Sequence, residues 1–169
     1  AFDEVFFNLS KKTDFEDYKK FVYLIIKKYK KNKYLSKNNN NYKRINLINS
    51  AFKNSKILLT YRDPLQHACS LLNQHKRFLS LQKKNKFILS YMNYLGHHEF
   101  GLNYKFWNKP IKFHDKLNVN HWLEQWYFFY KNILEKKSKF KNTILINYDK
   151  FCSNEELQNK LLGKINLSK

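Results

Sequence analysis

Apolar positions along the chain recur at two spacings, which predict an alternation of helices and strands. Spacing of three and four residues is typical of amphipathic helices, and short β-rich runs are typical of buried strands. The predicted helices cover residues 14–31, 42–52, 64–83, 86–95, 119–137 and 155–162. The predicted strands cover 33–36, 57–61 and 143–148, with a polar turn at 37–41 and a loop-rich stretch at 96–119. This order favours an α/β fold built on a parallel sheet.

The most informative junction in this pattern joins the strand at 57–61 to the helix at 64–83. The strand ends on Arg62, and Asp63 and Pro64 form a helix start, as an N-cap residue and a residue suited to the first turn. A helix N-terminus that follows a parallel strand attracts anions, because its N–H groups are unpaired and its dipole end is positive. Arg62 can grip a phosphate through two hydrogen bonds. Ser70 lies two turns further on. An ordinary turn with a surface arginine is the alternative.

Two predicted helices carry distinctive faces. The helix at 64–83 has a polar face with Gln66, Ser70, Gln74 and Arg77, and an apolar face with Leu65, Ala68, Leu72 and Leu79. The helix at 119–137 has an aromatic-rich stripe at helical spacing, formed by Trp122, Trp126, Phe129, Tyr130 and Ile133. Such a stripe predicts core packing rather than a surface for base stacking.

Composition sets limits on the class of protein. The 169 residues are 43% hydrophobic, which is enough for one core, and we expect a single domain. No apolar run approaches the ~18–20 residues that cross a membrane, so no membrane span is expected. Cys69 and Cys152 have neither metal nor disulfide spacing, which favours a reducing cytoplasm. Cys69 is expected to be a small buried residue.

The net charge of +20 suggests an anionic partner. The lysines are scattered through every segment, and the shared abundance of lysine, asparagine, isoleucine, tyrosine and phenylalanine is what an AT-rich genome produces. A basic chain suits an anionic nucleotide as well as a polymer, so we expect a nucleotide and no nucleic acid. A basic nucleic-acid-binding module is the alternative.

The junction resembles the 3′-phosphate-binding signature of sulfotransferases that use 3′-phosphoadenylyl sulfate (PAPS). In both, an Arg-x-Pro sequence is followed by a serine eight residues after the arginine. The resemblance implies that Arg62 and Ser70 bind the 3′-phosphate of the nucleotide. Residues 34–41 resemble the strand and loop that bring a lysine, here Lys37, near the transferring sulfonate. Many members carry a histidine base two positions later, where this chain has Asn39, which cannot take a proton at neutral pH.

The resemblance extends over nearly the whole chain. Residues 122–134 and 144–151 resemble the aromatic helix and the late strand and turn of the family, and 66–75 and 95–101 resemble its bacterial branch. The three glycines, at 96, 101 and 163, form no Gly-rich loop, so the 5′-phosphosulfate P-loop of the family has no counterpart here. We therefore expect residues 1–169 to be a truncated sulfotransferase domain that is inactive alone. It would have a partial parallel-sheet fold of the P-loop type, with helices flanking a short sheet.

The general base is sought in the loop His97-His98-Glu99, between Gly96 and Gly101. An imidazole titrates near neutral pH, and burial can raise the pKa of a glutamate toward it. His98 and Glu99 are therefore the candidate bases, with a polar loop and a satisfied histidine as the alternative. Adjacent loop residues point apart, so no metal is expected, although other histidines could contribute. These are His75, His114 and His121.

The resemblance implies a PAPS-dependent sulfotransferase. Its co-substrate would be PAPS, and its acceptor a hydroxyl or amine of a small molecule or carbohydrate. The candidate catalytic residues are Lys37, His98 and Glu99, and the candidate nucleotide-binding residues are Arg62 and Ser70. A non-catalytic scaffold related to the enzyme is a further alternative.

Overall fold

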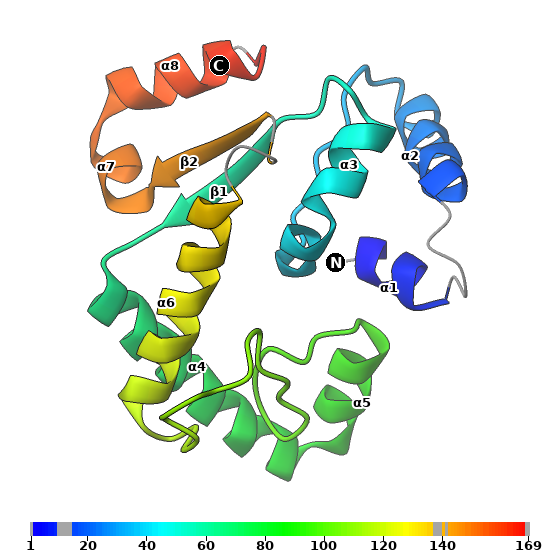
Figure 1. Cartoon of the computed structure of the whole chain (residues 1–169). Coiled ribbons are helices and arrows are strands. Elements are labelled where there is room, and N and C mark those ends of the chain that lie inside the picture. The colour runs from blue at the N-terminus through cyan, green and yellow to red at the C-terminus, as the bar shows by residue number, and fades with distance from the viewer. Residues whose placement is uncertain (1, 10–14, 137–139, 141, 168–169) are drawn as a thin grey trace. The chain divides into compact units, whose positions relative to one another are not determined.

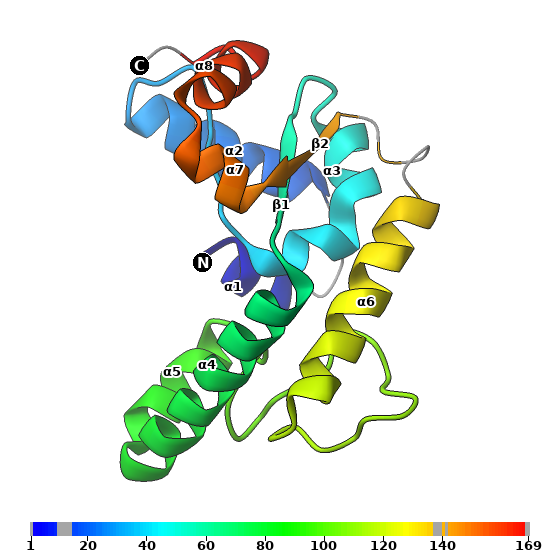
Figure 2. The ribbon, with the colours of Figure 1, turned by 90° about the vertical axis from the view of Figure 1, so that its left-hand side faces the viewer.

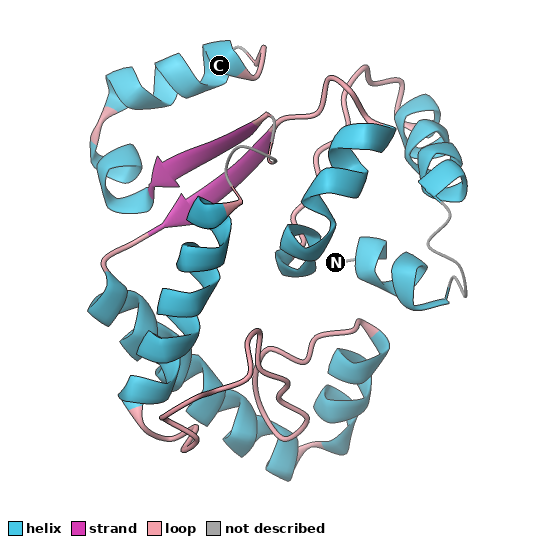
Figure 3. Ribbon diagram, in the orientation of Figure 1, coloured by secondary structure: helices cyan, strands magenta, loops and turns pink. Residues whose placement is uncertain are grey.

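The computed structural model describes residues 2–9, 15–136, 140 and 142–167. Its fold is mixed α/β and mostly helical, and the described residues include a two-stranded parallel sheet (Figures 1 and 3). The chain divides into two compact units, each made from two stretches of sequence. Unit 1 comprises residues 1–53 and 73–107, and unit 2 comprises residues 54–72 and 108–169.

Unit 1 is helical in its described part. Its elements are α1 (Phe2–Leu9), α2 (Phe15–Lys28), the 3₁₀-helix η1 (Asn39–Arg44), α3 (Ile45–Ala51), the part of α4 (Pro64–Lys84) from Asn73 onward, and α5 (Lys86–Tyr94). The core joins α1 to α2 through Val5, Tyr18 and Val22, which are all buried. The Phe7 and Tyr18 rings pack with centroids 4.8 Å apart. Asparagine side chains begin two of the elements, since Asn38 caps η1 and Asn85 caps α5.

Unit 2 contains the sheet. Its elements are β1 (Ile57–Tyr61), the first part of α4, α6 (Val119–Glu135), β2 (Thr143–Asn147), α7 (Tyr148–Ser153) and α8 (Glu155–Lys164). Ile57 is opposite Thr143 and Tyr61 is opposite Asn147, so both strands end at the same edge. The Tyr130 hydroxyl of α6 donates to the Thr60 carbonyl of β1 at 2.7 Å, which fixes this helix to the strand.

The strongest local signals of the sequence are confirmed. The strand at 57–61 is present and is parallel to its partner, and α4 begins at Pro64. The Asp63 carboxylate accepts from the Gln66 backbone N–H at 2.9 Å, as an N-cap should. The aromatic stripe of α6 packs inward, with Trp122 fully buried and its indole N–H donating to the Lys116 carbonyl at 3.0 Å. No helix in the described ranges has both the length and the apolar character to cross a bilayer.

One local prediction is wrong and another is confirmed only in part. Residues 33–36 form no strand, because the hydroxyls of Tyr34 and Ser36 are both bound to the carboxylate of Asp3 in α1. The helix predicted at 42–52 is a 3₁₀-helix up to Arg44 and becomes α-helical only from Ile45, since the Asn38 cap starts the turn within the asparagine run.

Two residues of α4 that the sequence places in the core are exposed in the structure. Leu65 is exposed because it lies in the first turn, before the buried stretch of the helix begins at Ala68. Cys69 is exposed rather than buried, since one residue along a helix turns the side chain by about 100° away from the inward position of Ala68. Cys152 of α7 is exposed as well.

Candidate functional site

The shared edge of the two strands in unit 2 carries Arg62 after β1 and Tyr148 and Asp149 after β2. Figure 2 shows α4 continuing from the end of β1 and α7 continuing from the end of β2. The Arg62 Nε atom lies 3.4 Å from Asp149 Oδ1, and its guanidinium carbon lies 5.2 Å from the centre of the Tyr148 ring. That Nε atom is buried and has no hydrogen-bond partner. The arginine is therefore held at the strand end by weak contacts that a stronger anionic ligand can replace.

His67 lies in the same neighbourhood, although no motif or spacing in the sequence singles it out. It lies one turn into α4, and its backbone N–H donates to the Asp63 carbonyl at 2.9 Å. Burial, and then the positive charge of Arg62, lower the pKa of His67 below its usual value. Its Nδ1 atom is buried without a hydrogen-bond partner. Ser70 lies one turn further along α4 with its side chain exposed.

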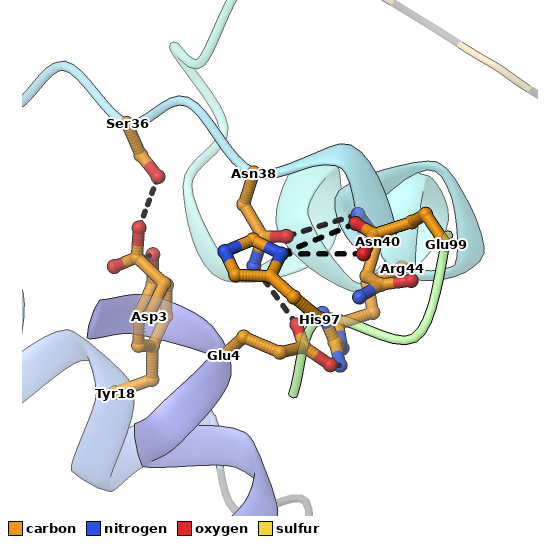
Figure 4. A network of polar contacts seen from close by, with 9 residues as sticks. All are labelled: Asp3, Glu4, Tyr18, Ser36, Asn38, Asn40, Arg44, His97 and Glu99. Carbon is orange, nitrogen blue, oxygen red and sulfur yellow. Dashed lines mark hydrogen bonds and ion pairs between the residues drawn. The ribbon is translucent and has the colours of Figure 1, made fainter. Parts of the chain in front are cut away.

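The second group of candidate residues lies in unit 1, where the segment around Lys37 is anchored on both sides. Ser36 donates to one carboxylate oxygen of Asp3, and the Asn38 amide donates to Glu4 Oε2 at 2.9 Å (Figure 4). Lys37 itself is exposed between these two anchors. The backbone of the lysine is thus fixed while its ammonium group faces solvent.

Asp3 is the centre of the first anchor. Its buried carboxylate also accepts from the hydroxyls of Tyr18 at 3.1 Å and Tyr34 at 2.6 Å. Burial and the hydrogen bonds to Asp3 raise the pKa of both tyrosines above the usual range. Both phenols therefore stay protonated and act as donors.

Glu4 is the centre of the second anchor. Arg44 donates to both of its carboxylate oxygens, each at 2.8 Å, and the guanidinium also lies 4.1 Å from the centre of the Phe7 ring. Burial raises the pKa of Glu4, but the hydrogen bonds from Arg44 and Asn38 outweigh it and hold the pKa below its usual value. Glu4 is therefore ionised, and its charge is matched by a bidentate partner.

The loop that contains His97 and Glu99 meets η1 through Asn39. His97 Nδ1 lies 3.3 Å from each carboxylate oxygen of the buried Glu99 (Figure 4), and the Asn39 side chain hydrogen-bonds the same carboxylate. Burial raises the pKa of Glu99, but these hydrogen bonds hold it below its usual value. The expected rise of the Glu99 pKa toward neutrality is therefore not found, and this glutamate is a weak base.

His98 lies beside this pair and has different properties. Burial and the charge of Lys105 lower the pKa of His98 below its usual value, so the imidazole is neutral at pH 7. Its Nδ1 atom is buried and lacks a hydrogen-bond partner. A neutral imidazole with one unpaired nitrogen can accept a proton, which fits the role of a base better than Glu99 does.

Two of the three histidines considered as metal ligands, His75 and His121, are hydrogen-bonded to backbone groups. His75 Nδ1 accepts from the Gly101 N–H at 3.2 Å, and His121 Nδ1 donates to the Phe113 carbonyl at 2.7 Å. Within the described residues no group of three or more His, Cys, Asp or Glu side chains could hold a metal ion. His75 and His121 are thus buried polar side chains, and a hydrogen bond to a backbone group orients each ring.

The candidate residues therefore form two groups, with Lys37, His98 and Glu99 in unit 1 and Arg62 and Ser70 in unit 2. The sequence brought out these five residues but not Asp3, Glu4 and His67, whose partners are recognisable only in the fold. Comparisons with protein-family models, with curated proteins and with solved structures gave no match to this chain.

The buried Glu99 predicts a specific response to acid. A carboxyl group whose folded pKa lies below its unfolded value stabilises the fold above the unfolded value, and this contribution disappears as pH falls through the folded pKa. We expect Glu99→Gln to lower the free energy of unfolding at pH 7, and to lose less stability than the unmodified protein as pH falls below the usual glutamate value of 4.5. Urea unfolding followed by circular dichroism across this range measures the effect. Glu156→Gln, at an exposed position of α8, is the control, and equal acid sensitivity of all three proteins would contradict the prediction.

Proposed function

We propose that this chain is part of a PAPS-dependent sulfotransferase, with the partial P-loop-type fold of that family. The observation that carries the proposal is the junction at Arg62, where a parallel strand ends on a cation and a capped helix begins two residues later. An arginine fork beside a helix N-terminus suits a phosphate group that is already fully charged. This segment resembles the 3′-phosphate signature of the family. The bound group would therefore be the 3′-phosphate of the nucleotide, with Ser70 as a second ligand.

Sulfonyl transfer needs a cation near the developing charge and a base for the acceptor hydroxyl or amine. In this proposal Lys37 supplies the cation, because its exposed ammonium group sits on a backbone that Asp3 and Glu4 anchor through the neighbouring residues. His98 supplies the base, since it is neutral at pH 7 and has an unpaired ring nitrogen. Glu99 acts through His97 as a positioning residue. The acceptor would be a small molecule or carbohydrate.

Asp149 allows a further test of the proposal, because its carboxylate lies beside Arg62, the residue proposed to bind the phosphate. A bound phosphate would take over the guanidinium of Arg62 from this carboxylate, and the two negative charges would repel one another. Removal of the Asp149 charge should therefore strengthen binding, whereas removal of the Arg62 charge should weaken it. An arginine that only packs on the surface would show neither effect.

The test is calorimetric titration with adenosine 3′,5′-bisphosphate. We expect binding that is at least about ten-fold weaker in Arg62→Ala, as for the loss of a charge-assisted hydrogen-bond pair. Asp149→Asn should bind several-fold more tightly, and 5′-AMP should bind less well than the bisphosphate. Lys160→Ala, on exposed α8 in the same unit, should leave the affinity unchanged.

Equal affinity for 5′-AMP and the bisphosphate would contradict a 3′-phosphate site. Equal weakening by Arg62→Ala and Lys160→Ala would show attraction by net charge alone. Absence of binding in a chain with the native circular dichroism spectrum would contradict the proposal as well.

A further inference from the structure

Helix α5 has two faces of opposite exposure, although both are apolar. The inward face includes Met92 and, just after the helix, Leu95, both buried. The outward face contains Phe87, Tyr91 and Tyr94, which are 70%, 47% and 58% exposed. Their spacing of four and three residues aligns them along one side of the helix over about 10 Å. Core packing explains the apolar residues of the inward face. It does not explain Phe87, Tyr91 and Tyr94 on the outward face, which are here called the α5 aromatic stripe.

The rings of this stripe are arranged to accept flat ligands. Phe87 and Tyr91 stack with centroids 5.7 Å apart and planes only 10° from parallel. Parallel rings on a helix surface present flat π faces in the same direction, which is the geometry on which further planar groups can stack.

The charge around the stripe is of one sign. Residues 73–107 have a single acidic side chain, Glu99, and it is buried and hydrogen-bonded. All basic side chains of the same stretch are exposed: Lys76, Arg77, Lys83, Lys84, Lys86 and Lys105. Residues 18–62 contain no Asp or Glu either, so the basic character of the α5 surface is shared with another part of the chain, and it is the neighbouring aromatic rings that set this surface apart. Three of the six cations directly precede the stripe in the sequence.

We propose that the end of α4 and the α5 aromatic stripe form a binding surface for single-stranded nucleic acid. The lysines at 83, 84 and 86 would contact backbone phosphates, and Phe87, Tyr91 and Tyr94 would stack with unpaired bases. Duplexes lack accessible base faces, so the stacking favours single strands. This surface uses none of the residues assigned to sulfonyl transfer and is a second activity of unit 1. It departs from the sequence-based expectation of no nucleic-acid partner, because exposed lysines here directly precede a stacked pair of exposed rings.

The end of α2 offers a matched comparison for charge. It carries Lys27, Lys28, Lys30, Lys31 and Lys33, all exposed, around Tyr29, which is 62% exposed. This cluster has more lysines than the α5 surface but has a single ring in place of a stacked series. Charge alone predicts that α2 dominates polyanion binding, whereas stacking predicts that α5 does.

The test is fluorescence anisotropy of a labelled oligothymidylate titrated with the full chain at several salt concentrations. Phe87→Ala/Tyr91→Ala should weaken binding at least about ten-fold, while Tyr29→Ala should leave it nearly unchanged. Lys83→Gln/Lys84→Gln/Lys86→Gln should reduce the slope of log affinity against log salt by about 2, at about 0.7 per phosphate contact. All replaced residues are exposed, and alanine favours helix, so the variants should keep the native fold.

Three outcomes would overturn the proposal. The first is equal affinity for the oligothymidylate and for a duplex or heparin, together with no effect of the aromatic replacements. Such binding would be nonspecific attraction of any polyanion. The second is a larger loss in the matched α2 lysine variant, Lys27→Gln/Lys28→Gln/Lys31→Gln, than in the α5 variant. The third is a dimer, seen by sedimentation, that the aromatic replacements dissociate and that binds no oligonucleotide, since the stripe would then pair two copies of the chain.

Discussion

Replacing Arg44 by alanine is expected to lower the free energy of unfolding by about 3–5 kcal/mol. The side chains of Arg44 and Glu4 are only 15% and 8% exposed, and the guanidinium donates to both carboxylate oxygens. Removal of Arg44 leaves a buried carboxylate that keeps the Asn38 amide as a donor but has lost its positive partner, and this uncompensated charge dominates the cost. Urea unfolding followed by far-UV circular dichroism measures the loss.

Two variants test the cause of that loss. Arg44→Lys keeps the charge but not the fork, so an intermediate loss is expected. Lys131→Ala removes one partner of the exposed Lys131–Glu135 pair of α6, 3.9 Å apart, and should cost less than about 1 kcal/mol. Similar small losses for Arg44→Ala and Lys131→Ala would contradict the account of a buried, stabilising pair.

Replacing Gly101 by alanine is expected to cost about 2–4 kcal/mol, from backbone strain and overpacking together. The φ angle of Gly101 is +84°, in a region that side chains rarely adopt, and an added Cβ would lie 2.6 Å from Gln82 Cδ. Gln82 is buried and cannot easily move, because it accepts from the Leu102 N–H at 2.7 Å and donates to Met92 Sδ at 3.0 Å. Thermal and urea unfolding measure the change.

The matched control is the glycine of α8. Gly163 has no atoms within 4 Å of an added Cβ and no positive φ angle, so Gly163→Ala should stabilise the protein by about 0.5 kcal/mol. Equal effects of the two replacements would mean that the φ angle and the Gln82 contact of Gly101 do not determine its cost.

Local signals explain which parts of the fold were predictable. The strand at 57–61 and the start of α4 were predictable because an apolar run, an N-cap aspartate and a proline each act within a few residues. Helix α7 was not predicted, since its six residues are too few for a periodic pattern and its cap, Asn147, is also the last residue of β2. The strand at 57–61 and the start of α4 thus differ from α7 in having signals that are local and long enough to be recognised in the sequence.

Long-range polar contacts explain why the site was only partly predictable. Lys37 and the loop at 97–99 were selected from residue type and position, and their link through Asn39 became visible only in the fold. Tyr34 and Ser36 alternate as in a strand, but their hydroxyls bind Asp3, which lies more than thirty residues earlier. Periodicity records which face of an element is buried and contains no information about such distant partners.

The two adjacent acids of α1 also affect how the protein tolerates trimming. A gene product that lacks this helix would retain the hydroxyls of Tyr18 and Tyr34 and the guanidinium of Arg44 in the interior, with their carboxylate acceptors gone. Such a product would expose or hydrate these groups by opening unit 1, and would be cleared by proteases or retained by chaperones in the cell. Expression yield and solubility are therefore set in part by α1, which makes this helix a poor place for shortening.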